Sequence, residues 1–121
     1  MNAIPESAFG NLLVGIDHEA PEERVDRLVS QSGIVIERIV STGQVSPEGI
    51  WYDDPRDEWV LLLTGSAALQ FEADGPARRQ LLPGDYVHIA AHSRHRVAWT
   101  DDTVPTVWLT VYFGADASAA C

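Results

Sequence analysis

Apolar and polar positions alternate along most of the chain in short runs, each bounded by residues that favour turns. A period of two is typical of a strand with one buried face, and Gly, Pro, Asp and Asn at the boundaries indicate turns. The pattern predicts strands over 34–40, 50–52, 58–64, 66–73, 78–82, 86–90, 94–99 and 106–113. Many short strands at this spacing indicate an all-β sandwich or barrel in a single domain.

The first 33 residues carry weaker signals. A short strand is expected over 11–16, and a helix over 21–31. Pro21 suits the first helical position and Gly33 suits the end of a helix. The apolar residues between them recur at helical spacing, at Val25, Leu28 and Val29.

Strand parity places two chemically active side chains on the inner face of this sheet. Successive strand residues face opposite sides, and arginines rarely face a core, so His95 is predicted to point inward between Arg94 and Arg96. In the strand over 58–64, Glu58 shares the face of the apolar residues that follow it at every second position. A carboxylate and an imidazole that converge inside a small β-barrel form a metal-site geometry.

These two stretches resemble the two motifs of the cupin superfamily. Gly84 and His95 stand at the first and last marked positions of the second motif, and Glu58 and Gly65 have the spacing that ends the first motif. The resemblance covers roughly residues 42–113. It implies a double-stranded β-helix, also called a jelly-roll barrel, here with one short N-terminal helix.

The chain departs from the cupin motifs at several positions. No His-x-His precedes Glu58, and the corresponding positions are Trp51 and Asp53, or Tyr52 and Asp54, depending on the gap. The second motif has Ala90 in place of its proline and His92 in place of its second glycine.

The resemblance therefore carries over two of the family's four metal ligands, Glu58 and His95. Asp53, which we favour over Asp54, and His92 are expected to complete a site for Zn²⁺, Mn²⁺, Fe²⁺ or Ni²⁺. Each residue also has a plainer interpretation: a hydrogen-bonded core histidine for His95, a solvent-exposed or arginine-paired carboxylate for Glu58, a solvated acidic loop, and an exposed turn residue for His92. Side chains expected to line the pocket are Tyr52, Trp108 and Tyr112.

Composition and charge exclude some partners. The 121 residues carry a formal net charge of −10, with a pI near 4.5, which argues against nucleic acid and against anionic membrane surfaces. No secretory signal and no membrane-spanning apolar run are visible, so a cytoplasmic location is expected. The single cysteine, Cys121, cannot form an internal disulfide.

The sequence thus predicts an N-terminal strand and helix over 1–33, a barrel over 34–113 and a flexible tail over 114–121. The first functional hypothesis is a metal-binding cupin with a pocket for a small polar molecule, such as a metal-dependent isomerase, lyase or dioxygenase. The alternatives are a non-enzymatic ligand-binding or sensor cupin without metal, and a dimeric structural module. A homodimer is expected in each case.

Overall fold

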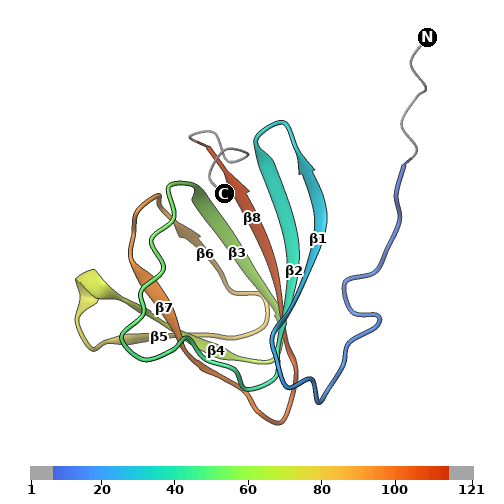
Figure 1. Cartoon of the computed structure of the whole chain (residues 1–121). Coiled ribbons are helices and arrows are strands. Elements are labelled where there is room, and N and C mark those ends of the chain that lie inside the picture. The colour runs from blue at the N-terminus through green and yellow to red at the C-terminus, as the bar shows by residue number, and fades with distance from the viewer. Residues whose placement is uncertain (1–6, 115–121) are drawn as a thin grey trace.

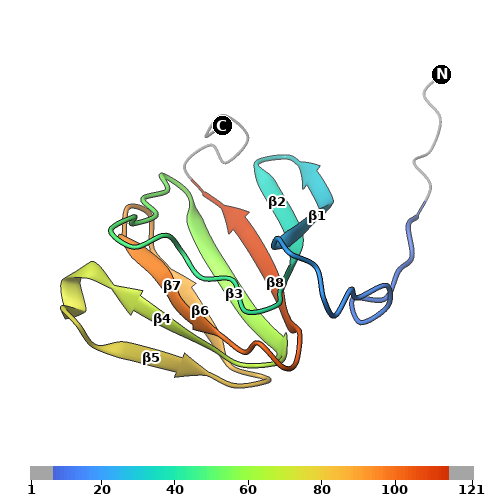
Figure 2. The same cartoon turned by 60° about the horizontal axis from the view of Figure 1, so that its bottom comes forward.

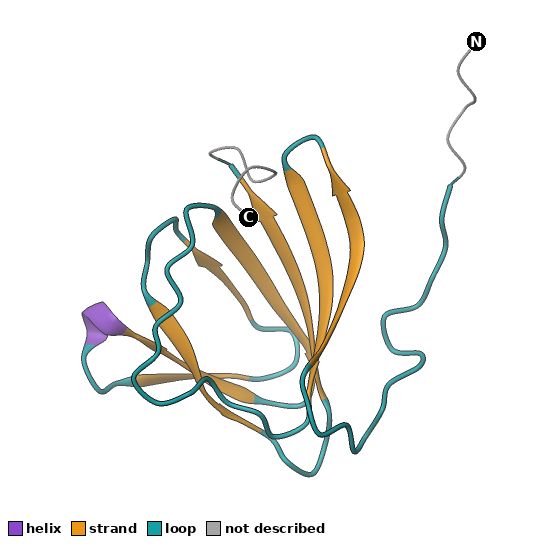
Figure 3. Ribbon diagram, viewed as in Figure 1, coloured by secondary structure: helices purple, strands orange, loops and turns teal. Residues whose placement is uncertain are grey.

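A computed structural model describes residues 7–114 of the chain, and almost all of its regular structure is strand (Figure 3). The predicted all-β fold is confirmed. The helical content of the described residues is one 3₁₀ turn, η1, at Glu72–Asp74. The strands are β1 Arg24–Gln31, β2 Ile34–Ser41, β3 Asp57–Thr64, β4 Ala67–Phe71, β5 Arg78–Leu81, β6 Tyr86–Ile89, β7 His95–Thr100 and β8 Thr106–Phe113.

The strands form two antiparallel sheets that face each other. One sheet has the order β1-β2-β8-β3-β6, and the other has the order β5-β4-β7 (Figures 1 and 2). Strands that are far apart in the sequence become neighbours in the first sheet, because β8 lies between β2 and β3. This arrangement brings residues near 37, 58 and 110 onto adjacent strands.

The core lies between the inner faces of the two sheets. Leu62 of β3 is fully buried, and Leu69 of β4 and Trp108 of β8 pack into the same cluster. Removing an apolar side chain of this size from water stabilises the fold by about 1.5–3 kcal/mol. The alternation in β3 is therefore held in register by its buried leucine and valine positions, and Glu58 follows the same face.

The helix predicted over 21–31 is wrong, because this segment forms β1. Ser32 and Gly33 both have positive φ, 52° and 75°, and form a two-residue hairpin turn that pairs Gln31 with Ile34. A β-bulge leaves Leu28 without a partner in the register. The extra residue breaks the period of two and produces the three- and four-residue spacing that resembled a helical stripe.

Other elements differ less from the expectation. The strand predicted over 11–16 is a turn, in which Asn11 Oδ1 accepts a hydrogen bond from the amide of Leu13 at 2.8 Å. The strand predicted over 50–52 reduces to one bridge between Tyr52 and His95. The strand predicted over 66–73 ends at Phe71, and η1 follows directly at Glu72. Apart from Gly114, the predicted tail lies outside the described residues, as does Cys121.

The segment between β2 and β3, residues 42–56, lies along β7 (Figure 1). The amide of Ser46 donates to the carbonyl of Val97 at 2.9 Å, and the amide of Tyr52 donates to the carbonyl of His95 at 2.7 Å. We call these residues the mouth segment, because several of them line the cavity described below. Within the described residues, no helix is long and apolar enough to span a membrane.

Candidate functional site

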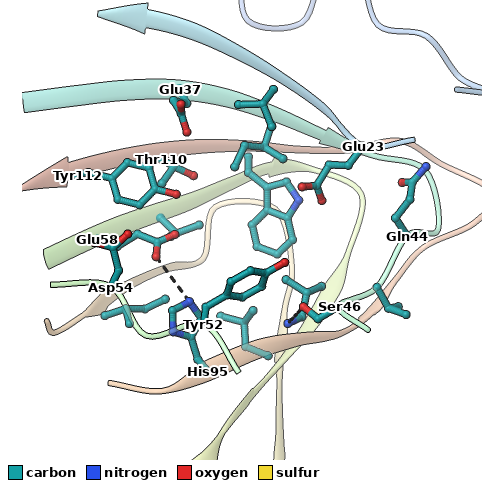
Figure 4. Close-up of a pocket in the computed structure, with 18 residues that line it drawn as sticks. Glu23, Glu37, Gln44, Ser46, Tyr52, Asp54, Glu58, His95, Thr110 and Tyr112 are labelled. Atoms are coloured by element: carbon teal, nitrogen blue, oxygen red, sulfur yellow. Dashed lines mark hydrogen bonds and ion pairs between the residues drawn. The ribbon is translucent and has the colours of Figure 1, made fainter. Parts of the chain in front are cut away.

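A cavity of about 430 Å³ lies between the two sheets (Figure 4). This volume is within the range typical of small-molecule sites. Its walls come mainly from β2, β3, β7, β8 and the mouth segment, and β1, β4 and β6 contribute one residue each. Tyr52, Trp108 and Tyr112, which the sequence predicts for the pocket, all line it.

The polar wall of the cavity is built on three adjacent strands. Glu37 of β2 lies opposite Thr110 of β8, and Tyr112 of β8 lies opposite Glu58 of β3. Residues directly opposite each other in an antiparallel pair face the same side of the sheet. The parity of the strands therefore directs all four side chains inward, and Figure 4 shows them gathered at one end of the pocket.

Glu58 and His95 meet across the cavity from the two sheets. Glu58 Oε2 lies 3.5 Å from His95 Nε2, and the two side chains are 14% and 8% exposed. On the other side of the ring, His95 Nδ1 donates to the carbonyl of Ser93 at 2.8 Å, which fixes the ring so that Nε2 faces Glu58. The sequence prediction that these two residues converge inside the barrel agrees with this placement.

The surroundings of His95 favour its protonated form. Burial alone lowers the pKa of a histidine, and this is the largest single effect on His95. The neighbouring Glu58 carboxylate and the Ser93 carbonyl act in the opposite direction and together outweigh burial. The pKa of His95 therefore lies above its ordinary value, which favours a protonated imidazole beside the Glu58 carboxylate.

Of the two adjacent aspartates, Asp54 is the one that lines the cavity. Its carboxylate accepts two hydrogen bonds from the Arg56 guanidinium, at 2.9 and 2.7 Å. These bonds lower the pKa of Asp54 below its ordinary value. The same guanidinium lies 4.0 Å from the centre of the Tyr112 ring. Burial, followed by the nearby carboxylates of Glu58 and Glu37, raises the pKa of Tyr112, which therefore stays protonated.

Asp53 and His92 lie together, but outside the cavity lining. His92 Nδ1 is 2.8 Å from Asp53 Oδ1, and the side chains are 67% and 46% exposed. His92 has a φ of 61°, in the left-handed region. The resemblance places a glycine at this position, and the backbone here adopts the conformation that glycine favours. The structure thus brings together Glu58 and His95 and places the other two predicted metal ligands at the outer turn.

Two carboxylates of the cavity were missed by the sequence analysis. Glu37 is 9% exposed and lines the inner wall, and Glu23 lines the cavity just before β1. The sequence carried a signal for Glu37, because it alternates with the apolar Val35 and Ile39 and must share their face. Glu23 was missed because the sequence analysis placed it in the helix predicted over 21–31.

The comparisons with known proteins agree with this architecture. The family model of the cupin domain matches residues 39–112, more than half of the chain. The chain belongs to the cupin family. Members of this family commonly bind metal ions and small ligands. No curated protein matches the chain.

Solved structures of other cupins are similar to this one. A putative mannose-6-phosphate isomerase from Ralstonia eutropha JMP134 is 50% identical, with a TM-score of 0.86 over 90% of this cupin and 100% of that chain. A cupin superfamily protein from Desulfitobacterium hafniense DCB-2 is 17% identical, with a TM-score of 0.66 over 81% and 83% of the two chains. A Cupin 2 conserved barrel domain protein from Salinispora arenicola CNS-205 is 22% identical, with a TM-score of 0.64 over 98% and 96%. The last two show the fold alone.

The donor set of this cupin does not fit the three or four protein ligands that hold a divalent metal. Within residues 7–114, no three side chains of His, Cys, Asp or Glu come together as a metal site. Glu58 and His95 contribute two donors. The Asp54 carboxylate beside them is bound by Arg56, and the Tyr112 phenol keeps its proton.

Proposed function

We propose that this cupin binds a small polar molecule in the barrel cavity and that Glu58 and His95 contact it directly. The observation that carries the proposal is the buried pair of these two residues, with His95 Nε2 facing Glu58 in a cavity of about 430 Å³. Convergent polar groups in a largely apolar cavity are the usual anatomy of a small-molecule site.

The pair can serve a ligand in two ways. With its proton on His95, it presents an N–H donor beside a carboxylate acceptor, which matches a hydroxyl or an amine that needs both. An imidazole beside a carboxylate also suits a proton-transfer reaction, because one group gives a proton while the other takes one. The name of the Ralstonia protein makes isomerisation the second candidate function.

The four-ligand metal site of Asp53, Glu58, His92 and His95 stays a prediction of the sequence. The placement of Asp53 and His92 at the outer turn supports the ligand-binding alternative over a metal-dependent isomerase, lyase or dioxygenase. Elemental mass spectrometry of the purified chain is expected to find much less than one equivalent of Mn, Fe, Ni or Zn. One equivalent that His95→Ala removes would restore the metal-dependent hypothesis.

The indole N–H of Trp108 is a natural reporter of occupancy. The Trp108 ring lines the cavity, and its Nε1 donates to Ser41 Oγ at 3.1 Å. We expect that at least one member of a panel of sorbitol, 1-amino-1-deoxysorbitol and sorbitol 6-phosphate shifts this signal in ¹H–¹⁵N spectra. Trp108→Phe assigns the signal among the four tryptophans.

Glu58→Gln is expected to weaken that binding by about tenfold, because it keeps the shape of the side chain and removes its charge. The matched control is Glu19→Gln, which neutralises an exposed glutamate outside both the cavity lining and the mouth segment. Equal affinities for both variants, or no shift of Trp108 with any of the three probes, would contradict the proposed function.

A homodimer and a cytoplasmic location are the remaining parts of the proposal. Strand β1 lies at the edge of the five-stranded sheet, and seven of its eight residues are exposed. An exposed edge strand offers unpaired backbone groups to another chain. We expect analytical ultracentrifugation to find a dimer. The double variant Val25→Lys with Val29→Lys should shift the equilibrium toward monomer. A wild-type monomer at tens of micromolar protein would refute the homodimer.

A further inference from the structure

We infer that the ligand of this cavity is a small organic cation, an amine or similar group, held by carboxylates and aromatic faces. The inference rests on the proposed function, because it specifies what the same cavity binds. The observations behind it are the charge of the lining, a hydroxyl on the deep wall and the arrangement of the aromatic rings.

Four carboxylates line the cavity, and they come from separate parts of the chain: Glu23, Glu37, Asp54 and Glu58. Among the described residues, His95 is the one basic side chain in the lining. The chain contains no lysine, and its permanently charged basic residues are eight arginines. The lining therefore has an excess of negative charge whichever protonation state His95 adopts.

The four carboxylates differ in how well basic side chains of the protein neutralise them. Asp54 is neutralised by Arg56, and Glu58 is paired with His95. Glu37 is 3.4 Å from Arg27, whose side chain is 62% exposed, so solvent screens much of that attraction.

Glu23 accepts a hydrogen bond from the hydroxyl of Ser41 at 2.9 Å, which is a neutral partner. Glu23 itself is exposed, whereas Glu37 is 9% exposed, and a buried carboxylate without a strong partner is costly. A bound cation would reduce that cost.

The deep wall also holds a hydroxyl that can take part in binding. Thr110 is 1% exposed and lines the cavity between Glu37 and Tyr112. A threonine hydroxyl can both donate and accept a hydrogen bond. A ligand N–H directed at this end of the cavity would reach Thr110 and the carboxylates of Glu37 and Glu58 together (Figure 4).

Aromatic rings complete the environment. Tyr52, Trp108 and Tyr112 line the same cavity. The faces of aromatic rings attract cations, most strongly when water is excluded. Arg56 already lies over Tyr112 in this way, with its guanidinium carbon 4.0 Å from the ring centre.

The same observations argue against a phosphorylated ligand. Phosphate is usually bound by arginine, by lysine or by the backbone amides at a helix N-terminus. Arg56 is occupied by Asp54, and the described residues contain no α-helix. A phosphate in this cavity would face the four carboxylates of the lining. In the charge of its lining, this cavity therefore differs from a site for mannose 6-phosphate, the sugar named for the Ralstonia protein.

A set of three probes with one carbon skeleton tests the charge. In titrations of the full chain followed at the Trp108 indole N–H, 1-amino-1-deoxysorbitol is expected to bind at least about tenfold more tightly than sorbitol. Sorbitol 6-phosphate is expected not to shift the signal. The advantage of the amine over sorbitol should shrink as salt is added, because salt screens charge.

Glu37→Gln is the decisive variant, because it removes one buried charge and leaves Glu58 and His95 in place. It should reduce the ratio of the affinities for the amine and for sorbitol by at least about threefold, whereas Glu19→Gln should not change that ratio. Sorbitol or its phosphate binding more tightly than the amine would overturn the cation inference and leave the proposed function standing. No shift of Trp108 with any probe would overturn both.

Discussion

Gly65→Ala should lower the free energy of unfolding by about 2–5 kcal/mol, because the backbone here has room for hydrogen alone. Gly65 has a φ of 79°, which disfavours any side chain. An added Cβ would overlap Thr106 Oγ1 and would lie 2.6 Å from Thr106 Cα and 2.8 Å from the carbonyl oxygen of Pro105. Thr106 is itself fully buried at the start of β8, so it cannot move aside.

Gly33→Ala is the matched control for this experiment. Gly33 has nearly the same φ, 75°, but nothing lies within 4 Å of the position of its Cβ. This variant should lose about 1 kcal/mol from backbone strain alone. Denaturant unfolding of both variants separates the two contributions, and equal losses would mean that the close contact between Gly65 and Thr106 carries no cost.

His95→Ala should destabilise the fold by about 3 kcal/mol near pH 6, because it leaves the Glu58 carboxylate buried without its partner. Both side chains are almost completely enclosed, so solvent screens the pair weakly. The double variant Glu58→Gln with His95→Ala should recover part of the loss, because the stranded charge is gone. A double variant that is as unstable as the sum of the single changes would show that the pair is not coupled.

The stability conferred by this pair should depend on pH. The pKa of His95 in the folded protein lies above its ordinary value, so protonation favours the folded state. This contribution is fully present below the unfolded pKa of about 6.5 and is lost as the pH rises through the higher pKa of the folded state. The destabilisation caused by His95→Ala should therefore shrink as the pH rises through that range, and a loss that grows with pH would contradict the assignment.

The sequence predicted most strands of the barrel because their inward and outward residues alternate with a period of two. The same parity placed Glu58 and His95 inside, and it would have placed Glu37 there too. Parity failed in β1, where the bulge at Leu28 adds a residue and the apolar spacing changes to that of a helix.

The choice between Asp53 and Asp54 was beyond the sequence for a different reason. Both aspartates lie in an irregular segment, where no repeating geometry links position to direction. Which of them faces the cavity depends on hydrogen bonds to partners far along the chain, such as the bond from the amide of His92 to the carbonyl of Asp54. The turn at His92 likewise became clear from its backbone angle and not from its residue type.

The way in which the mouth segment is attached makes local opening of the cavity independent of global unfolding. This segment is tied to β7 by a small number of hydrogen bonds at Gln44, Ser46 and Tyr52, whereas both sheets are held by long ladders. Breaking those few bonds uncovers the cavity and leaves every ladder intact, so local opening needs far less free energy than global unfolding. Exchange of a bound molecule with solvent can therefore be fast in a barrel that unfolds slowly, and substitutions in the mouth segment can change residence time without changing the melting temperature.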